Sequence, residues 1–241
     1  MRTVACESFN DRPKGEVIDT VIIHYTGMMS GEEALERLCD PAVEVSAHYM
    51  IEEDGGVFQL VAEEKRAWHA GVSQWAGREN LNHNSIGIEL VHPGHEFGYR
   101  SFAEMQIDSL LQLLHSINQR HAIPAHKYLG HSDIAPHRKT DPGELFPWNT
   151  LSLAGFGIVS NYHTRTGQLL ASKGDKGANI IDYKKLFARL GYAIEQSEMF
   201  DTAFYNIIWA FQSHWRQSKV TGQLDEGTRD VLLDLLEQSN L

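Results

Sequence analysis

Residue types that can bind a metal ion or move a proton lie close together in residues 130–148, which read GHSDIAPHRKTDPGELFPW. The segment contains His131, Lys139 and Asp141 together with three prolines. Because proline lacks a backbone donor and fixes its own φ, we expect an irregular, rigid loop here rather than a helix. Imidazole and carboxylate groups are zinc ligands, and a catalytic zinc ion often takes three protein ligands and one water molecule. His131 and Asp141 would therefore need one further ligand.

A candidate for that ligand lies at the end of an apolar run near the N-terminus. Residues 17–25, VIDTVIIHY, are rich in β-branched side chains and predict a strand buried on both faces, with His24 at its C-terminal end. A single histidine in such a place is more often an ordinary hydrogen-bonded side chain. However, His24, His131 and Asp141 all lie at the edges of predicted elements, where an open metal position can face a substrate. We therefore predict these three residues as one metal site.

The elements that must position these residues alternate between strands and helices. Further strands are expected at residues 46–52, 56–61, 85–91 and 128–129. Helices are expected at residues 31–39 and from about residue 102 to 120. Each follows a capping box, Ser30 with Glu33 and Ser101 with Glu104. This order predicts an α/β (α+β) domain with a mixed central β-sheet flanked by helices.

The C-terminal third has a different pattern. Apolar stripes at helical spacing predict helices at residues 180–190 and 200–215 and a last helix that starts at Asp225. Three short helices can close a small core of their own. We therefore expect a catalytic domain at 1–155, a connector at 156–174 and a small three-helix domain at 175–241.

Composition excludes several classes of protein. The 241 residues are 42% hydrophobic and carry a net charge of −11. They contain no apolar run of about 18 residues, so no transmembrane segment is expected. Without a basic face, this charge argues against nucleic acid as a partner, because phosphates would be repelled. Oligomeric state is not predicted.

The cysteines and the N-terminus bear on the compartment. Cys6 and Cys39 are the only cysteines, too few for a disulfide framework, and we expect plain thiols. The first residues lack the apolar segment of a secretory signal. We therefore expect a cytoplasmic protein, or a periplasmic one if a leader has been removed.

Most of the thirteen histidines are expected to be unremarkable. His115 belongs to the long predicted helix. Ordinary solvated side chains are expected at His83, His92, His95, His121, His126, His163 and His214.

Several motifs together resemble a known family. VIIHYT, SAHYMI, WHAG and SIGIEL, with HSDIAPHRKTDPGELFPW, resemble the zinc-dependent N-acetylmuramoyl-L-alanine amidases, a group related to phage lysozyme-type amidases and peptidoglycan recognition proteins. The likeness covers about residues 17–148. It implies one Zn²⁺ per chain, held by His24, His131 and Asp141, and peptidoglycan or muropeptide fragments as partners.

The same resemblance implies two catalytic residues, Glu89 in SIGIEL and Lys139. Glu89 would act as general base toward water and return the proton to the leaving amine. Lys139 would hydrogen-bond the developing oxyanion. The alternatives are a surface glutamate on a strand and a solvated loop lysine. Against the first, the apolar residues around Glu89 predict a half-buried strand, where a lone carboxylate needs a reason.

The remaining motif residues carry weaker expectations. Trp68 and His69 are predicted to line the substrate groove, whereas His48 and His69 could equally have structural roles. Tyr49 and Trp148 are expected to pack in the core. His137 and Arg138 carry no predicted role.

The C-terminal segment resembles the three-helix peptidoglycan-binding domain of cell-wall hydrolases, over about residues 173–237. The predicted function is hydrolysis of the amide between the lactyl group of N-acetylmuramic acid and L-alanine of the stem peptide, in cell-wall turnover or recycling. Two alternatives remain open: a non-catalytic peptidoglycan recognition protein, and a zinc peptidase that cleaves within the stem peptide. The sequence does not distinguish anhydro from non-anhydro substrates.

Overall fold

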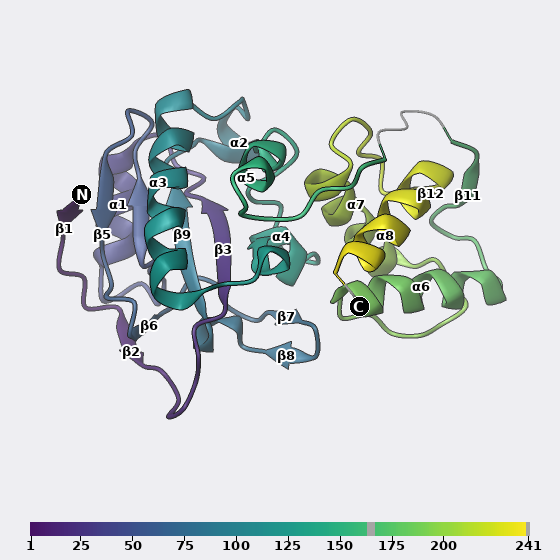
Figure 1. Ribbon diagram of the computed structural model, residues 1–241, viewed down its shortest axis with the longest axis horizontal. Helices are drawn as coiled ribbons and strands as arrows, with labels where there is room; N and C mark the ends of the chain where they lie inside the picture. The colour runs from purple at the N-terminus through teal and green to yellow at the C-terminus, as the bar shows by residue number, and fades with distance from the viewer. Residues whose placement is uncertain (163–166, 240–241) are drawn as a thin grey trace.

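A mixed six-stranded β-sheet forms the centre of the computed structural model, which describes residues 1–162 and 167–239 (Figure 1). The strand order is β1-β5-β4-β9-β3-β10. These strands are β1 (Arg2–Thr3), β3 (Thr20–Tyr25), β4 (Tyr49–Ile51), β5 (Val57–Gln59), β9 (Ser85–Leu90) and β10 (Tyr128–Gly130). Strand β3 runs parallel to both β9 and β10, and β4 pairs antiparallel with β5 as the predicted hairpin. The predicted mixed sheet is confirmed.

Three short antiparallel ribbons lie outside the main sheet. They pair β2 (Phe9–Asp11) with β6 (Lys65–Ala67), β7 (Gln74–Trp75) with β8 (Arg78–Glu79), and β11 (Leu169–Ala171) with β12 (Leu224–Asp225). The sequence patterns did not predict them, because each strand has only two or three residues.

Helices lie on both sides of the sheet and in the C-terminal third (Figure 1). They are α1 (Gly31–Cys39), α2 (Gly94–Phe97), α3 (Glu104–His121), α4 (His131–Ile134), α5 (Trp148–Leu153), α6 (Ala178–Leu190), α7 (Thr202–Trp215) and α8 (Glu226–Gln238), with 3₁₀ turns η1 (Leu81–His83) and η2 (Ala125–Lys127). The Ser30 side chain caps α1 as predicted, accepting from the Glu33 amide at 3.2 Å. Asp225 likewise caps α8.

Two local predictions are wrong. Helix α3 starts at Glu104 with Ala103 as its N-cap and no side-chain cap, so Ser101 lies too far upstream to form a capping box. The segment at residues 130–148 is not wholly irregular, because residues 131–134 form the one-turn helix α4. This turn precedes the three prolines, and the Asp133 side chain caps it by accepting from the Gly130 amide at 2.7 Å.

The sheet is covered on two faces by different parts of the chain. Val21 and Ile23 of β3 join the apolar cluster that includes Leu110 and Leu114 of α3. Ile22 of the same strand joins a second cluster, which also holds Phe211 and other residues of the C-terminal helices. A near-continuous apolar strand is thus buried on both faces, as its sequence predicts. Tyr49 and Trp148 are also buried, as predicted.

The expectation of plain thiols is wrong, because Cys6 and Cys39 form a disulfide. Their Cα atoms are 4.5 Å apart although the residues are separated by 33 positions in sequence. Both belong to the apolar cluster beneath α1, and this packing brings the N-terminal segment to the end of the helix. Sequence spacing alone could not predict that contact.

Two histidines expected to be solvated, His92 and His214, are buried. The His92 ring stacks on Phe102 with centroids 4.4 Å apart, and its Nε2 lies 2.9 Å from the Arg100 carbonyl oxygen. His163 lies outside the described residues. Among the helices that are described, none combines the length and the apolar character needed to cross a bilayer.

Candidate active site

The register of the sheet brings the predicted site residues together. His24 and Glu89 are direct neighbours on the parallel strands β3 and β9, near the carboxyl ends of both. On the other side of β3, strand β10 leads directly into His131, the first residue of α4. Residues from three adjacent parallel strands therefore meet at the carboxyl ends of these strands, where such sheets commonly bind their ligands.

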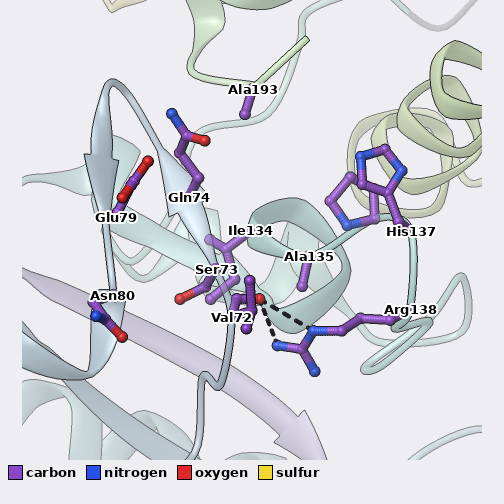
Figure 2. A pocket seen from close by; sticks show the side chains of 11 residues that line it. Val72, Ser73, Gln74, Glu79, Asn80, Ile134, Ala135, His137, Arg138 and Ala193 are labelled. Carbon is purple, nitrogen blue, oxygen red and sulfur yellow. Dashed lines mark hydrogen bonds between the residues drawn. The ribbon is translucent and has the colours of Figure 1, made fainter.

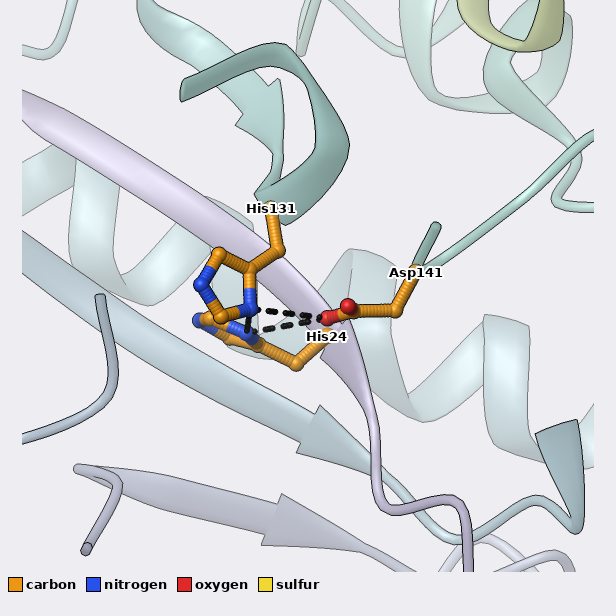
Figure 3. Close-up of side chains that lie close together, drawn as sticks. All are labelled: His24, His131 and Asp141. Carbon is orange, nitrogen blue, oxygen red and sulfur yellow. Dashed lines mark hydrogen bonds and ion pairs between the residues drawn. The ribbon is translucent and has the colours of Figure 1, made fainter. Parts of the chain in front are cut away.

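Asp141 completes a three-donor cluster with the two histidines (Figure 3). The Nδ1 atoms of His24 and His131 are 2.9 Å apart, and each lies 3.1 Å from Asp141 Oδ2. All three side chains are buried. Donors about 2.0–2.2 Å from one tetrahedral ion would lie about 3.3–3.5 Å apart. The cluster is thus close to the geometry of a metal site, and these residues could hold a metal ion.

A hydrogen-bonded chain fixes which nitrogen of His24 faces the cluster. The Ser85 hydroxyl donates to the Leu81 carbonyl, so its oxygen is left to accept from His69 Nε2 at 3.1 Å. His69 Nδ1 must then accept from His24 Nε2, 3.0 Å away. His24 therefore carries its proton on Nε2 and presents the Nδ1 lone pair toward Asp141 and His131, as a metal ligand must.

Glycine at position 87 makes room for this chain. A Cβ atom there would collide with the His69 ring. The Gly87 amide donates to His48 Nδ1 at 3.0 Å, and the His48 ring lies edge-on to His69. His48 thus lies behind His69 and supports it.

His131 is fixed from the opposite side by the segment at residues 70–72. Its Nε2 lies 3.3 Å from both the Ala70 carbonyl oxygen and Arg138 Nη2, and the tautomer that donates from Nε2 to the carbonyl presents the Nδ1 lone pair to a metal ion. Arg138 donates to the carbonyls of Ala70 and Val72, the latter at 2.8 Å. No role was predicted for Arg138 from the sequence, where its position beside Lys139 is the one signal that points to it.

The charges in the cluster suit a cation. Burial, together with His131, lowers the pKa of His24 to about 4, so this imidazole is neutral at pH 7. Burial alone would raise the pKa of Asp141, but the two histidines hold it well below its usual value. Neutral imidazole and ionised carboxylate are the forms in which these side chains bind zinc.

Glu89 and Lys139 share a cavity of about 360 Å³ with His69, His131 and Asp141. The Glu89 side chain is buried, and its Oε2 atom has no hydrogen-bond partner within residues 1–162 and 167–239. Burial, followed by the charge of Asp141, raises the pKa of Glu89 well above its usual value. A buried acid with a raised pKa in a cavity is a candidate for proton transfer.

Of the two residues predicted to line the groove, His69 lines this cavity. Trp68 is not among the residues that line this cavity, and its Nε1 donates to Asn10 Oδ1 of strand β2 at 3.2 Å. Arg37 of α1, which stands in no recognisable motif, also lines the cavity.

A second cavity, of about 460 Å³, adjoins the first through Arg138, which lines both (Figure 2). Its wall combines apolar side chains, such as Val72 and Ile134, with the polar Gln74 and Asn80. Ala193 of the C-terminal segment also contributes.

A three-donor cluster, a buried acid and a lysine around one cavity are the groups that a metal-dependent hydrolase uses. The chain belongs to the N-acetylmuramoyl-L-alanine amidase family, whose model matches residues 14–144. It is 34% identical to the N-acetylmuramoyl-L-alanine amidase AmiD of Escherichia coli K12 over 233 residues, which are 92% of this chain and 83% of AmiD. The prediction of an enzyme of this class is confirmed.

Solved structures of related enzymes have the same fold. The complex of E. coli AmiD with the substrate anhydro-N-acetylmuramic acid-L-Ala-D-gamma-Glu-L-Lys has a TM-score of 0.79 and 32% identity, covering 94% of this chain and 92% of that chain. AmpDh3 from Pseudomonas aeruginosa in complex with anhydromuramic pentapeptide has a TM-score of 0.81 and 34% identity, covering 94% of each chain.

Proposed function

We propose that this enzyme hydrolyses the amide between the lactyl group of N-acetylmuramic acid and L-alanine of the stem peptide, with one Zn²⁺ held by His24, His131 and Asp141. The observation that carries this proposal is the convergence of their three donor atoms within about 3 Å of one another, beside the buried Glu89. A zinc ion bound there would supply Lewis acidity toward the scissile carbonyl and the attacking water.

The protein's own groups would handle the proton and the developing charge. Glu89 accepts a proton from the attacking water and returns it to the amine of L-alanine as the C–N bond breaks. Lys139, in the same cavity, stabilises the negative charge that develops on the carbonyl oxygen, a contribution of about 3 kcal/mol if it resembles other oxyanion donors. His69 holds His24 in the required tautomer.

Muropeptide fragments of the anhydro type are the proposed substrates, as in the complexes of AmiD and AmpDh3. A glutamate linked through its γ-carboxyl keeps a free α-carboxylate. Arg37, Arg138 and Lys139 line the metal-site cavity and favour such an anion despite the net charge of −11. The adjoining cavity beside Arg138 offers room for the distal part of the peptide.

Product masses test the proposal directly. We expect digestion of anhydro-N-acetylmuramyl-L-Ala-D-γ-Glu-L-Lys to give two products, the free anhydro sugar acid and the intact tripeptide. Cleavage within the tripeptide would instead identify a peptidase. Binding without any product after prolonged incubation with added zinc would identify a recognition protein.

The C-terminal segment, residues 175–241 in our division, is proposed to bind peptidoglycan. This rests on its sequence resemblance to three-helix wall-binding domains. Co-sedimentation of the full chain with purified peptidoglycan, in the presence and absence of excess soluble substrate, tests it. Binding that soluble substrate abolishes would place the contact at the active site and contradict a separate binding domain.

The disulfide bears on the compartment. Disulfides persist in oxidising compartments such as the periplasm and are rare in the cytosol. The Cys6–Cys39 disulfide therefore favours the periplasmic alternative over the cytoplasmic expectation. Thiol alkylation of the enzyme immediately after cell lysis should leave both cysteines unlabelled, whereas labelling of both would support the cytoplasm.

A further inference from the structure

The C-terminal segment contacts the turn that carries His131. The Asp133 carboxylate, fully buried, accepts three hydrogen bonds. One comes from the Gly130 amide at 2.7 Å and closes the turn itself. The other two come from the C-terminal segment, from His214 Nδ1 at 2.7 Å and from the Tyr192 hydroxyl at 3.1 Å. Asp133 thus joins the turn next to His131 to two residues far away in sequence.

Aromatic stacking fixes the ring of His214 in place. Its centroid lies 3.6 Å from Trp148, at the end of the proline-rich loop, and 3.7 Å from Trp215, with nearly parallel planes in both cases. The Trp215 indole in turn donates to the Ile158 carbonyl at 3.1 Å. With both faces covered, the plane of the imidazole is fixed, and the hydrogen bond to Asp133 selects the ring orientation in which Nδ1 points at the carboxylate.

A second contact holds the loop just beyond Asp141. Gln217, two residues after the end of α7, donates from its Nε2 to the carbonyl oxygens of Glu144 at 2.8 Å and Phe146 at 2.7 Å. The loop also has backbone hydrogen bonds of its own, such as that from the Ser132 amide to the Asp141 carbonyl at 2.9 Å, and its Leu145 amide donates to the Tyr99 hydroxyl of the first domain at 2.9 Å. The two bonds from Gln217 add a contact from the C-terminal segment to the side of the loop that follows Asp141.

The two parts also share apolar packing. Ile134 and Ala135 of the ligand-bearing segment belong to the same buried cluster as Phe211 of α7 and Leu235 of α8. In Figure 1, α4 lies on the side of the first domain that faces α7.

We propose that His214, Tyr192 and Gln217 form a clamp through which the C-terminal helices position the metal ligands His131 and Asp141. The inference rests on the proposed zinc site, and it gives the C-terminal segment a role in the chemistry that is separate from binding the cell wall. The three clamp residues are positioning residues, since they act through Asp133 and the loop backbone.

Packing between two domains for stability alone is the competing explanation, and matched variants separate the two. His214→Phe keeps an aromatic ring between the two tryptophans and removes the Nδ1 donor. His214→Asn restores a donor near the Nδ1 position. Gln217→Met removes the two hydrogen bonds to the loop. As a control, Lys184→Met removes a buried ammonium group of α6 that contacts Ser197 and Asp201 within the helical segment itself.

Zinc affinity, measured by competition with a chromophoric chelator, is the primary measurement, alongside kcat, KM and the melting temperature of each full-length variant. We expect His214→Phe and Gln217→Met to weaken zinc binding by about 10- to 100-fold and to lower kcat more than they change KM. His214→Asn should recover part of the affinity. Lys184→Met should lower the melting temperature and leave zinc affinity and kcat at the parental values.

Parental zinc affinity and kcat in both His214→Phe and Gln217→Met would overturn the clamp. Losses of zinc affinity and kcat that simply scale with the fall in melting temperature, and that appear in Lys184→Met as well, would also overturn it. If His214→Phe does not fold, Gln217→Met decides the question by the same criteria. An unaltered enzyme that binds no zinc would overturn the proposed function, and the clamp with it. An unaltered enzyme that binds zinc and cleaves substrate, beside unaffected variants, would overturn the clamp alone.

Discussion

Hydrogen-bond partners, rather than residue types, determine what the histidines near the proposed metal site can do. His24 and His69 lie in contact, yet only His24 belongs to the three-donor cluster. The Ser85 hydroxyl donates its hydrogen to the Leu81 carbonyl, so toward His69 Nε2 it can only accept a hydrogen bond. His69 therefore donates from Nε2 and accepts at Nδ1 from His24 Nε2, and this places the His24 proton on Nε2.

Replacing His69 with leucine should therefore weaken zinc binding. The His24 Nε2–H would lose its acceptor, and loss of such a partner typically lowers metal affinity by about 10- to 100-fold. Chelator competition measures the effect. Trp68→Leu is the matched control, since Trp68 precedes His69 but faces Asn10. We expect near-parental zinc affinity and KM for it, and a large rise in KM would show that Trp68 does contact substrate.

The sequence predicted the candidate ligands because each stands in a recognisable motif at the end of an element. It could not predict that Ser85, Arg138 and Arg37 contribute to the site. Ser85 acts through one hydroxyl on a strand, and Arg138 through carbonyls 66 and 68 positions away. Contacts of that kind leave no periodic pattern in the sequence.

At the scale of elements, local signals predicted well and pairing between distant segments did not. Strand β3, the β4–β5 hairpin and helices α6 to α8 follow from apolar periodicity, turn residues and caps within each segment. The β2–β6 ribbon and the Cys6–Cys39 disulfide depend on segments that meet only in the folded chain. Helix α4 was missed because its cap, Asp133, is held in place by the C-terminal segment.

One polar contact between elements should make stability depend on pH. Glu63, after β5, accepts hydrogen bonds from Arg120 and His121 at the end of α3 and from Tyr49 of β4. Although burial opposes them, these partners lower the pKa of Glu63 to about 2, from a usual value near 4.5. A carboxylate with a depressed pKa stabilises the fold above its unfolded pKa, and this stabilisation is lost as pH falls through the folded one.

We expect the free energy of unfolding to fall between pH 4.5 and pH 2, with about 2 kcal/mol due to Glu63 after allowance for solvent screening. In Glu63→Gln that part of the pH dependence should disappear. Urea denaturation at several pH values measures it. The neighbouring Glu64→Gln serves as control and should keep the parental slope. An unchanged slope in Glu63→Gln would show that other carboxylates account for the acid sensitivity.

Considered as a whole, the molecule brings together three proposed metal ligands that are far apart in sequence and within hydrogen-bonding distance in space. His24 and Asp141 are separated by 117 positions and His24 and His131 by 107. Spacing alone cannot predict such convergence, so the resemblance to the amidases was needed. The three-helix segment was expected to have its own core, but its apolar cluster also includes residues of β3 and β10.

Removal of zinc should lower the stability of the whole molecule. An ion that binds only the folded state stabilises it by about 2.7 kcal/mol at one hundred times its dissociation constant. We therefore expect chelator treatment to lower the melting temperature by several degrees, and added zinc to restore it. His24→Ala should melt at one temperature with or without zinc. A zinc-dependent shift of parental size in His24→Ala would place the stabilising ion elsewhere.

The central claim separates metal binding by His24, His131 and Asp141 from proton transfer by Glu89. The most direct test is the rate of muropeptide hydrolysis by Glu89→Gln, with the zinc content determined on the same sample. The proposed site predicts one zinc ion per chain and a rate at least about 100-fold below the parental rate. Hydrolysis at the parental rate by the zinc-loaded variant would contradict the proposed role of Glu89 as the base.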